Sequence, residues 1–83
     1  MYKYQNLLDY LKAKKPEQDR IILTFAEIES ILGFDLPPSA RFHRPWWGNE
    51  SKGTHTHRLS WMNAGWLVDG VDLVNSSVSF RRK

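Results

Sequence analysis

The chain of 83 residues contains no cysteine and no apolar run that approaches the roughly 18 residues of a membrane span. Without cysteine, neither a disulfide bond nor a thiolate metal site can stabilise the fold. The sequence also lacks a glycine-rich phosphate loop and a G-x-S-x-G nucleophile motif. We therefore expect a non-catalytic cytoplasmic protein, of bacterial or phage origin, that carries no cofactor and does not enter a membrane.

One small domain is expected to span residues 1–83. Hydrophobic residues make up 41% of the chain and aromatic residues 13%, which is enough for a globular core and too much for a disordered chain. No internal repeat, linker or low-complexity tract divides the sequence. A chain of this length supports one modest core.

Charge is unevenly distributed along the chain, although the net charge is only +3. Residues 17–35 carry five carboxylates and a single cation, Arg20. Residues 41–58 carry four cations, a single carboxylate and all three histidines. A domain with one basic and one acidic region is suited to an oriented encounter with a polyanion such as nucleic acid.

Apolar spacing and cap chemistry predict the first two helices. The first, over residues 2–14, carries an apolar stripe and ends before Pro16. The stripe consists of Tyr4, Leu7, Leu8 and Leu11. The second helix begins with a capping box between Thr24 and Glu27 and ends at Gly33, a residue suited to the left-handed conformation.

Further elements follow from proline, glycine and β-branched residues. The double proline at 37–38 predicts a short helical segment over residues 39–41. A third helix is expected from Thr54 or Thr56 to about Ala64, closed by Gly65. Three strands are expected at residues 20–23, 66–73 and 77–81.

The order helix, strand, helix, helix, strand, strand predicts an α+β fold of the winged helix-turn-helix type. In that motif the third helix is the recognition helix, which enters the major groove of DNA. The last two strands would form the wing, with a turn at Asn75 and Ser76 as its tip and with Arg81 and Arg82 nearby.

Three stretches of the sequence carry a family resemblance. They read TFAEIESILGFDLPPSA, WWGN and WMNAGW, and together they match the pattern TFxEIExILGxxLPxSA, WWxN and WxxAGW. On these motifs the chain resembles an uncharacterised family of small bacterial and phage domains, a domain of unknown function. The resemblance covers most of residues 20–81 and leaves the N-terminal helix outside. It implies one compact domain and supports no enzymatic activity.

Binding of double-stranded DNA is the leading functional interpretation. Basic and histidine side chains gather near the start of the predicted recognition helix and at the end of the predicted wing, where they would contact phosphates or base edges. The predicted nucleic-acid-binding residues are Arg41, Arg44, Lys52, His55, Arg58, Arg81 and Arg82.

Two adjacent tryptophans, Trp46 and Trp47, are a second candidate contact. Adjacent side chains rarely both point inward, so we expect one ring in the core and the other near the surface. The outer ring could stack on a base or on a partner side chain. Trp61 and Trp66 are expected in the core, because a small domain needs their volume.

A metal site is not expected. The histidines His43, His55 and His57 have a spacing that suits a strand or a loop, no cysteine accompanies them, and the nearest carboxylate is Glu50. Contact with phosphate is the preferred role for these side chains.

Two alternatives involve protein partners. The chain could be a small interaction module, such as a phage-type inhibitor or adaptor that acts on a host protein or nucleoprotein, with the acidic residues 17–35 as its contact surface. A homodimer formed through the apolar stripe of the first helix is also possible.

Overall fold

A computed structural model describes residues 2–49 and 56–83 of the chain. It contains a three-stranded antiparallel sheet and several short helices, which confirms the predicted α+β class. In chain order the elements are α1 (Gln5–Lys12), β1 (Arg20–Thr24), α2 (Phe25–Leu32), α3 (Pro38–Phe42), η1 (Arg44–Trp47), η2 (Thr56–Arg58), α4 (Leu59–Met62), β2 (Trp66–Asp72) and β3 (Ser77–Arg82).

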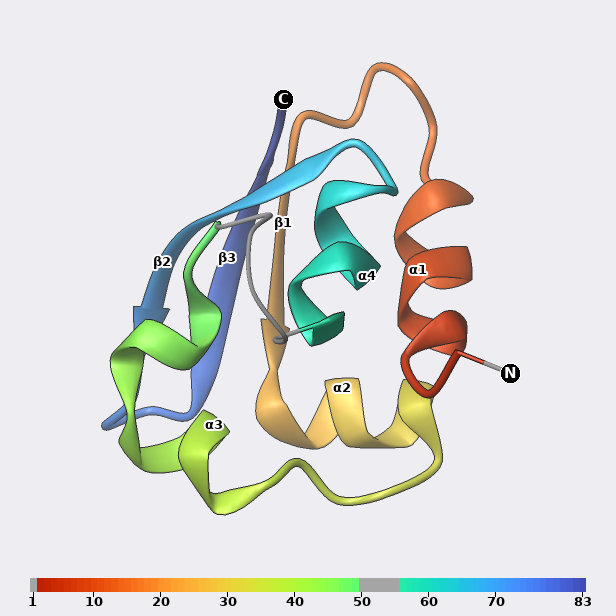
Figure 1. Ribbon diagram of the computed structural model, residues 1–83. Helices are drawn as coiled ribbons and strands as arrows, with labels where there is room; N and C mark the ends of the chain where they lie inside the picture. Colours follow the sequence, from red (N-terminus) through yellow and green to blue (C-terminus); the bar gives the residue numbers. More distant parts are fainter. Residues whose placement is uncertain (1, 50–55) are drawn as a thin grey trace.

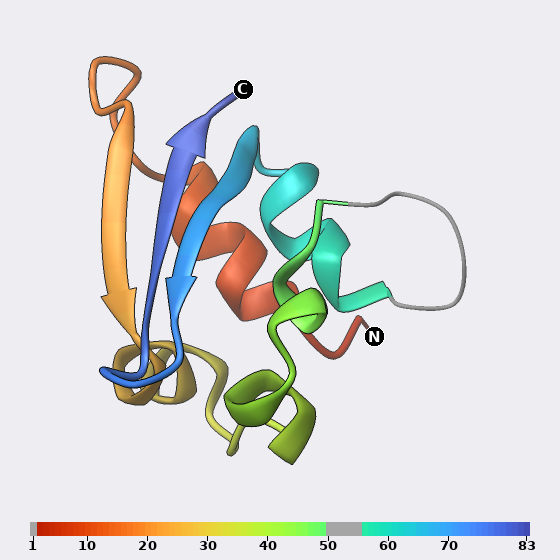
Figure 2. The ribbon, with the colours of Figure 1, turned by 90° about the vertical axis from the view of Figure 1, so that its left-hand side faces the viewer.

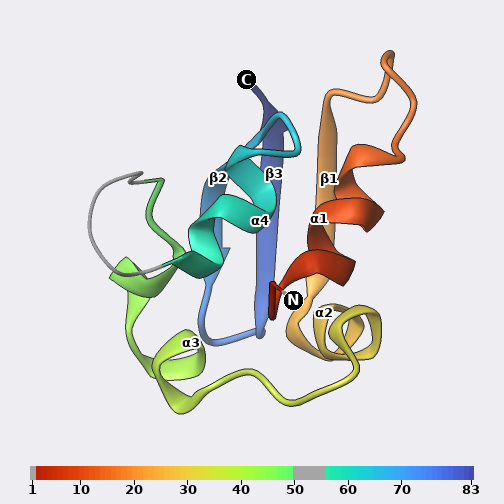
Figure 3. The ribbon, with the colours of Figure 1, turned by 45° about the vertical axis from the view of Figure 1, so that its right-hand side comes forward.

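Among the described residues, helices cover one face of the sheet. Its strand order is β1-β3-β2, so β3 lies in the middle and β1 and β2 form the two edges. Helices α1 and α4 lie side by side over one face of the sheet, while no helix of residues 2–49 and 56–83 covers the opposite, open face (Figures 1 and 2). Helix α2 closes the end of this layer, next to α1 (Figure 3).

The second helix forms as its local sequence predicts. The Thr24 hydroxyl accepts from the Glu27 amide at 3.1 Å, and the Glu27 carboxylate accepts from the Thr24 amide at 2.9 Å. This capping box satisfies two amides that lack partners within the helix. Gly33 then ends the helix with φ of +86°, in the left-handed region that glycine occupies without strain.

The core lies between the sheet and the helices, and aromatic rings fill much of it. The alternation along β3 turns Val78 and Phe80 inward, as predicted. The largest fully buried side chains are Trp61, Trp66, Phe25, Phe80, Leu7, Leu11, Ile28 and Val78. The burial of Trp61 and Trp66 confirms their predicted place. Because Leu7 and Leu11 of α1 are buried within the chain itself, they are not available to a partner helix.

The third helical segment differs from its prediction. The described part begins with the 3₁₀ turn η2, and α4 is a single turn that ends at Met62. Arg58, Ser60 and Trp61 of this segment are buried, so these side chains pack inside the domain. Gly65, with φ of +90°, closes the segment as predicted.

The predicted position of the wing arginines is wrong. Strand β3 leaves the turn at Ser77 and reaches Arg81 and Arg82 only at its far end. Arg81 is paired with Arg20 and with Leu67, at the opposite end of the sheet from the hairpin tip (Figure 1). A strand rises more than 3 Å per residue, so the last residues of β3 cannot lie beside its first.

The hairpin tip has its own polar contacts. The Asp72 carboxylate accepts from the backbone and side-chain amides of Asn75, and these two bonds hold the pKa of that carboxyl below its ordinary value. Ser76 adopts φ of +55°, which a tight turn requires. Within residues 2–49 and 56–83, no helix is long and apolar enough to cross a membrane.

Candidate functional site

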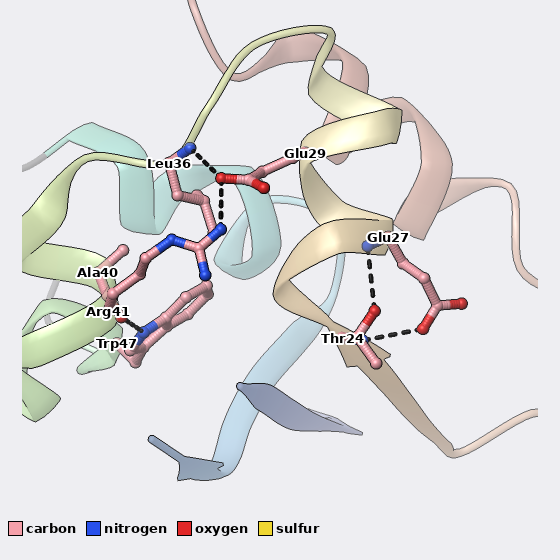
Figure 4. A network of polar contacts seen from close by, with 7 residues as sticks. All are labelled: Thr24, Glu27, Glu29, Leu36, Ala40, Arg41 and Trp47. Carbon is pink, nitrogen blue, oxygen red and sulfur yellow. Dashed lines mark hydrogen bonds and ion pairs between the residues drawn. The ribbon is translucent and has the colours of Figure 1, made fainter. Parts of the chain in front are cut away.

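Arg41, a predicted contact to DNA, is tied to its own chain. Its guanidinium donates to the Glu29 carboxylate at 2.8 Å, and the same carboxylate oxygen accepts from the Leu36 amide at 2.7 Å (Figure 4). The arginine also lies over the ring of Phe25, 5.6 Å from its centre. These contacts fasten α3 to α2 across the proline turn, so the primary role of Arg41 is to hold these helices together.

The Glu29 contacts predict a specific pH dependence. The hydrogen bond from the Leu36 amide, followed by that from Arg41, lowers the pKa of Glu29 below its ordinary 4.5. A carboxyl with a lowered folded pKa contributes stability that is full above pH 4.5 and is lost as pH falls through the folded value. Glu29→Gln should therefore lower the free energy of unfolding by about 1 kcal/mol at pH 7, allowing for solvent screening.

Urea unfolding of both proteins at pH 7 and pH 3 measures this difference. The gap between wild type and Glu29→Gln should shrink at pH 3. A gap that is unchanged between the two pH values would show that the carboxylate charge does not stabilise the turn. Asp35→Asn is the matched control, because Asp35 lies in the same turn and is exposed.

Asn49 pairs with the outer edge of β2 as a neighbouring strand would. Its amide nitrogen donates to the Val68 carbonyl at 2.8 Å, and its Oδ1 accepts from the Val68 amide at 2.8 Å. The same oxygen accepts from the Trp61 indole at 3.1 Å. Asn49 therefore has a structural role, in which it joins its loop to a strand edge and to a core ring. Further along the edge, Arg44 donates to the Val71 carbonyl.

A cavity of about 370 Å³ lies between the residues of η1 and this edge of β2. Arg44, Trp47 and Asn49 line one side, and Val68, Asp69 and Gly70 line the other. Its polar groups are largely engaged elsewhere in the chain, since Asn49 is bound to Val68 and the Asp69 carboxylate is bound to Arg20 at 2.7 Å. We assign no ligand to this cavity.

The tryptophan pair divides as predicted into one core and one outer ring. Trp47 is buried, and its indole donates to the Ala40 carbonyl at 2.8 Å. Trp46 is half-buried, and its ring stacks on His57 with centres 3.8 Å apart and planes 5° apart. His57 is also bonded through Nε2 to the Trp46 carbonyl at 2.7 Å. One face of the outer ring is therefore already covered within the chain.

Two further predicted contacts, Arg58 and Arg82, bond to backbone carbonyls inside the chain. Arg58 is buried and donates to the Pro45 carbonyl at 2.8 Å. Arg82 donates to the carbonyls of Lys15 at 2.8 Å and Gln18 at 3.0 Å, and its guanidinium stacks on Trp66 at 4.1 Å. Both arginines connect segments that are distant in sequence, and this accounts for their presence without a ligand.

Cations nevertheless gather at one end of the molecule. The end of α1, the connection to β1, the start of β1 and the end of β3 meet there (Figure 1). The cationic side chains that these segments carry are Lys12, Lys14, Lys15, Arg20, Arg81, Arg82 and Lys83. We call this set the basic end. It also includes the carboxylates of Glu17, Asp19 and Asp69, so cations outnumber anions there.

The opposite end of the molecule is richer in carboxylates. It contains α2, the connection to α3 and the β2–β3 hairpin (Figure 1). Its carboxylates are Glu27, Glu29, Asp35 and Asp72. We call this set the acidic end. The charge asymmetry in space runs along the strands and differs from the one in the sequence, because Arg41 and Arg44 of the basic stretch contact Glu29 and Val71 at the acidic end.

Sequence reasoning missed the lysines of the basic end. In the sequence, Lys12, Lys14 and Lys15 stand at the end of the first predicted helix, and Arg20 is the single cation among the carboxylates of residues 17–35. The pairing of Arg20 with Arg81 brings these segments to the C-terminal end of β3. The one sequence signal for this basic end was the run Arg81, Arg82 and Lys83 at the end of the chain.

The remaining predicted nucleic-acid-binding residues do not form one surface among the described residues. Lys52 and His55 lie outside the described residues. Arg81 is exposed and lies 3.6 Å from Asp69, at the basic end, whereas Arg44 is exposed near the hairpin. Among residues 2–49 and 56–83, no group of three His, Asp or Glu side chains is arranged to hold a metal ion.

Comparison with known proteins supports the resemblance drawn from the motifs. A family model described as Domain of unknown function (DUF7662) matches residues 4–83. The match includes α1, which the motif resemblance left outside. No curated protein and no solved structure matches the chain.

Proposed function

The chain belongs to the family described as Domain of unknown function (DUF7662), which names no activity, and from its geometry we propose a non-catalytic domain that binds duplex DNA through phosphate contacts. The observation that carries the proposal is the basic end. Its cations come from the four segments that meet there, and most of them are exposed. A cluster of lysines and arginines on one surface is the electrostatic footprint of a protein that binds nucleic acid.

The winged-helix interpretation is supported by topology. The order α1, β1, α2, α4, β2, β3 and the sheet order β1-β3-β2 agree with a three-stranded winged helix, and α3 and the turns η1 and η2 are additional elements between α2 and α4. The contact surface proposed here differs from the recognition helix expected from sequence. The buried residues Ser60 and Trp61 leave little of α4 free to enter a groove, and the hairpin tip carries Asp72 and no cation.

The basic end is suited to sequence-independent contact with a phosphate backbone. Lys12, Lys15 and Lys83 are exposed, and none of the three has a resolved ion pair among the described residues. Arg20 and Arg81 share the carboxylate of Asp69, which keeps both guanidinium groups on the open face of the sheet. About four phosphate contacts would give a slope near −4 in a plot of log affinity against log salt concentration.

Binding to a labelled duplex of about 25 base pairs, followed by fluorescence anisotropy at several salt concentrations, tests the proposal. Lys15→Glu should weaken binding by about 5-fold or more at 50 mM salt, because it reverses a charge within the basic end. Lys3→Glu is the matched control, since Lys3 is an exposed lysine near the start of α1, away from that end. Lys12→Glu combined with Lys15→Glu and Lys83→Glu should lower the affinity further and flatten the salt dependence.

Two results would contradict DNA binding through the basic end. One is the absence of wild-type binding to any duplex at about 50 mM salt, where phosphate contacts are strongest. The other is an equal loss of affinity in Lys3→Glu and Lys15→Glu, which would indicate a general charge effect. Circular dichroism of each variant confirms that the fold is retained.

A protein-interaction module is the second candidate. Two large apolar side chains are strongly exposed, Phe42 at 81% and Val74 at 92%. They lie at the end of α3 and in the β2–β3 hairpin, both in the part of the molecule that holds the acidic end (Figure 1). A basic host protein is the complementary partner. Capture of such a protein from lysate by wild type, and its loss in Phe42→Ser with unchanged DNA binding, would favour this function.

A further inference from the structure

Strand β1 pairs with β3 on one side, and no strand among the described residues pairs with its other edge. The hydrogen bonds of β1 show which of its backbone groups face that edge. Successive residues of a strand turn their amide and carbonyl groups to opposite sides. The Phe25 amide donates to Ser76 and the Asp19 carbonyl accepts from Arg82, so odd-numbered positions face β3. The Thr24 amide donates instead to the Glu27 side chain, away from β3. Even-numbered positions of β1 therefore face outward.

Ile22 lies at the centre of that edge. Its amide and carbonyl turn outward by this alternation, and no hydrogen bond among the described residues engages either group outside the sheet. Its side chain is 68% exposed on the open face of the sheet. Ile22, the middle residue of this edge strand, thus combines outward-facing backbone groups with an uncovered apolar side chain. An edge strand with these two features can pair with a strand of another chain.

We propose that a second copy of this chain pairs its β1 antiparallel to β1 of the first, about a two-fold axis at Ile22. In this arrangement the Ile22 amide donates to the partner's Ile22 carbonyl, and the Ile22 carbonyl accepts from the partner's Ile22 amide. The two isoleucine side chains lie across from each other on the open face. The result is a continuous six-stranded sheet with an isologous interface.

Charge complementarity supports this occupant. Antiparallel pairing centred on Ile22 places Arg20 across from the partner's Thr24. The Glu27 carboxylate is bonded to the Thr24 amide at 2.9 Å, so each Arg20, which also binds Asp69 of its own chain at 2.7 Å, gains the partner's Glu27 as a second carboxylate neighbour. The two-fold axis repeats this ion pair at the other end of the interface. At a larger scale, the basic end of each copy lies beside the acidic end of the other, which orients the encounter.

The same contacts limit the pairing to a closed dimer. The Glu27 carboxylate occupies the outward amide of Thr24, and the Gln18 side chain lies 3.5 Å from the Arg20 carbonyl. Neither end of the β1 edge therefore offers a further pair of free backbone groups. The interface contains the two Ile22 bonds, the apolar contact and the ion pairs, so a weak dimer is expected rather than a fibre.

Sedimentation equilibrium between about 5 and 500 µM protein tests the dimer. Wild type should shift from monomer to dimer across this range. Ile22→Lys should raise the dissociation constant at least 10-fold, because two like charges meet at the axis. Val74→Lys is the matched control: it replaces another exposed aliphatic side chain with lysine in the β2–β3 hairpin, outside the β1 edge, and should raise the dissociation constant far less than Ile22→Lys.

A second variant separates the ion pair from the strand contact. Glu27→Gln keeps an oxygen that can accept from Thr24 and removes only the charge, so it should raise the dissociation constant about 3-fold. If Ile22→Lys does not fold, Ile22→Thr keeps the β-branched shape and should still weaken the dimer.

Wild type that remains monomeric throughout, or an equal effect of Ile22→Lys and Val74→Lys, overturns the proposal. The dimer does not depend on DNA binding, and the measurement is made without nucleic acid.

Discussion

Replacing Trp61 with alanine is expected to lower the free energy of unfolding by about 3–5 kcal/mol. The side chain is fully buried, and its ring stacks on Trp47 with centres 5.7 Å apart and contacts Phe80 at 6.0 Å. Its indole also donates to Asn49 at 3.1 Å. Alanine would leave a cavity at the point where α4, the sheet and the η1 segment meet.

A loss of this size is a large part of the stability of a small domain, which is about 5–15 kcal/mol in total. Urea unfolding followed by circular dichroism measures it, and Trp61→Phe keeps the experiment interpretable if the alanine variant does not fold. Trp46→Ala is the matched control, because that half-buried ring mainly loses its stack on His57 and should cost less. A change below about 1 kcal/mol in Trp61→Ala would show that the ring is not central to the core.

Asn49→Ala is expected to cost about 2 kcal/mol, because it removes the three hydrogen bonds that Asn49 makes to Val68 and Trp61. Water can replace the bonds at the exposed strand edge. It cannot easily reach the indole of a fully buried tryptophan, so the Trp61 donor is left without an acceptor. The outer edge of β2 would also lose the side-chain amide of Asn49 that bonds to Val68.

Asn49→Asp provides a pH-sensitive test of the same contacts. The carboxylate keeps an acceptor for the Val68 amide and for Trp61, but its second oxygen faces the Val68 carbonyl, where the amide nitrogen donated. Only the protonated carboxyl can donate there, so its folded pKa should be raised above the unfolded one. The variant should then gain stability as pH falls from 7 to 4, relative to Asn49→Ala. A difference in the free energy of unfolding between Asn49→Asp and Asn49→Ala that is the same at pH 7 and at pH 4 would contradict this role.

Local motifs made much of the fold predictable. Thr24, Glu27 and Gly33 act through backbone atoms within a few residues, so their sequence pattern was sufficient to define α2. The alternation of Val78 and Phe80 likewise gave the buried face of β3. The third helix was less predictable, because a 3₁₀ turn and a single α turn depend on how Arg58 and Trp61 are held by distant segments.

The candidate site was harder to predict than the fold. Arg58 and Arg82 look like available cations in a sequence, yet each donates to backbone carbonyls that only folding brings near. Nothing in the neighbourhood of Lys12, Lys14 and Lys15 along the chain links these side chains to Arg81. The strand pairing of Arg20 with Arg81 makes that link.

The sequence by itself determined the helix boundaries set by caps and glycines, the α+β class, the family, and the division of the tryptophan pair into a core and an outer ring. Only the tertiary structure decided which cations stay exposed, that they gather at the end of the sheet away from the hairpin, and that Ile22 faces outward on an open edge. The physical reason is range: capping bonds and side-chain alternation act over a few residues. Charge clusters and free strand edges arise from pairing between segments about sixty residues apart, such as Arg20 and Arg81.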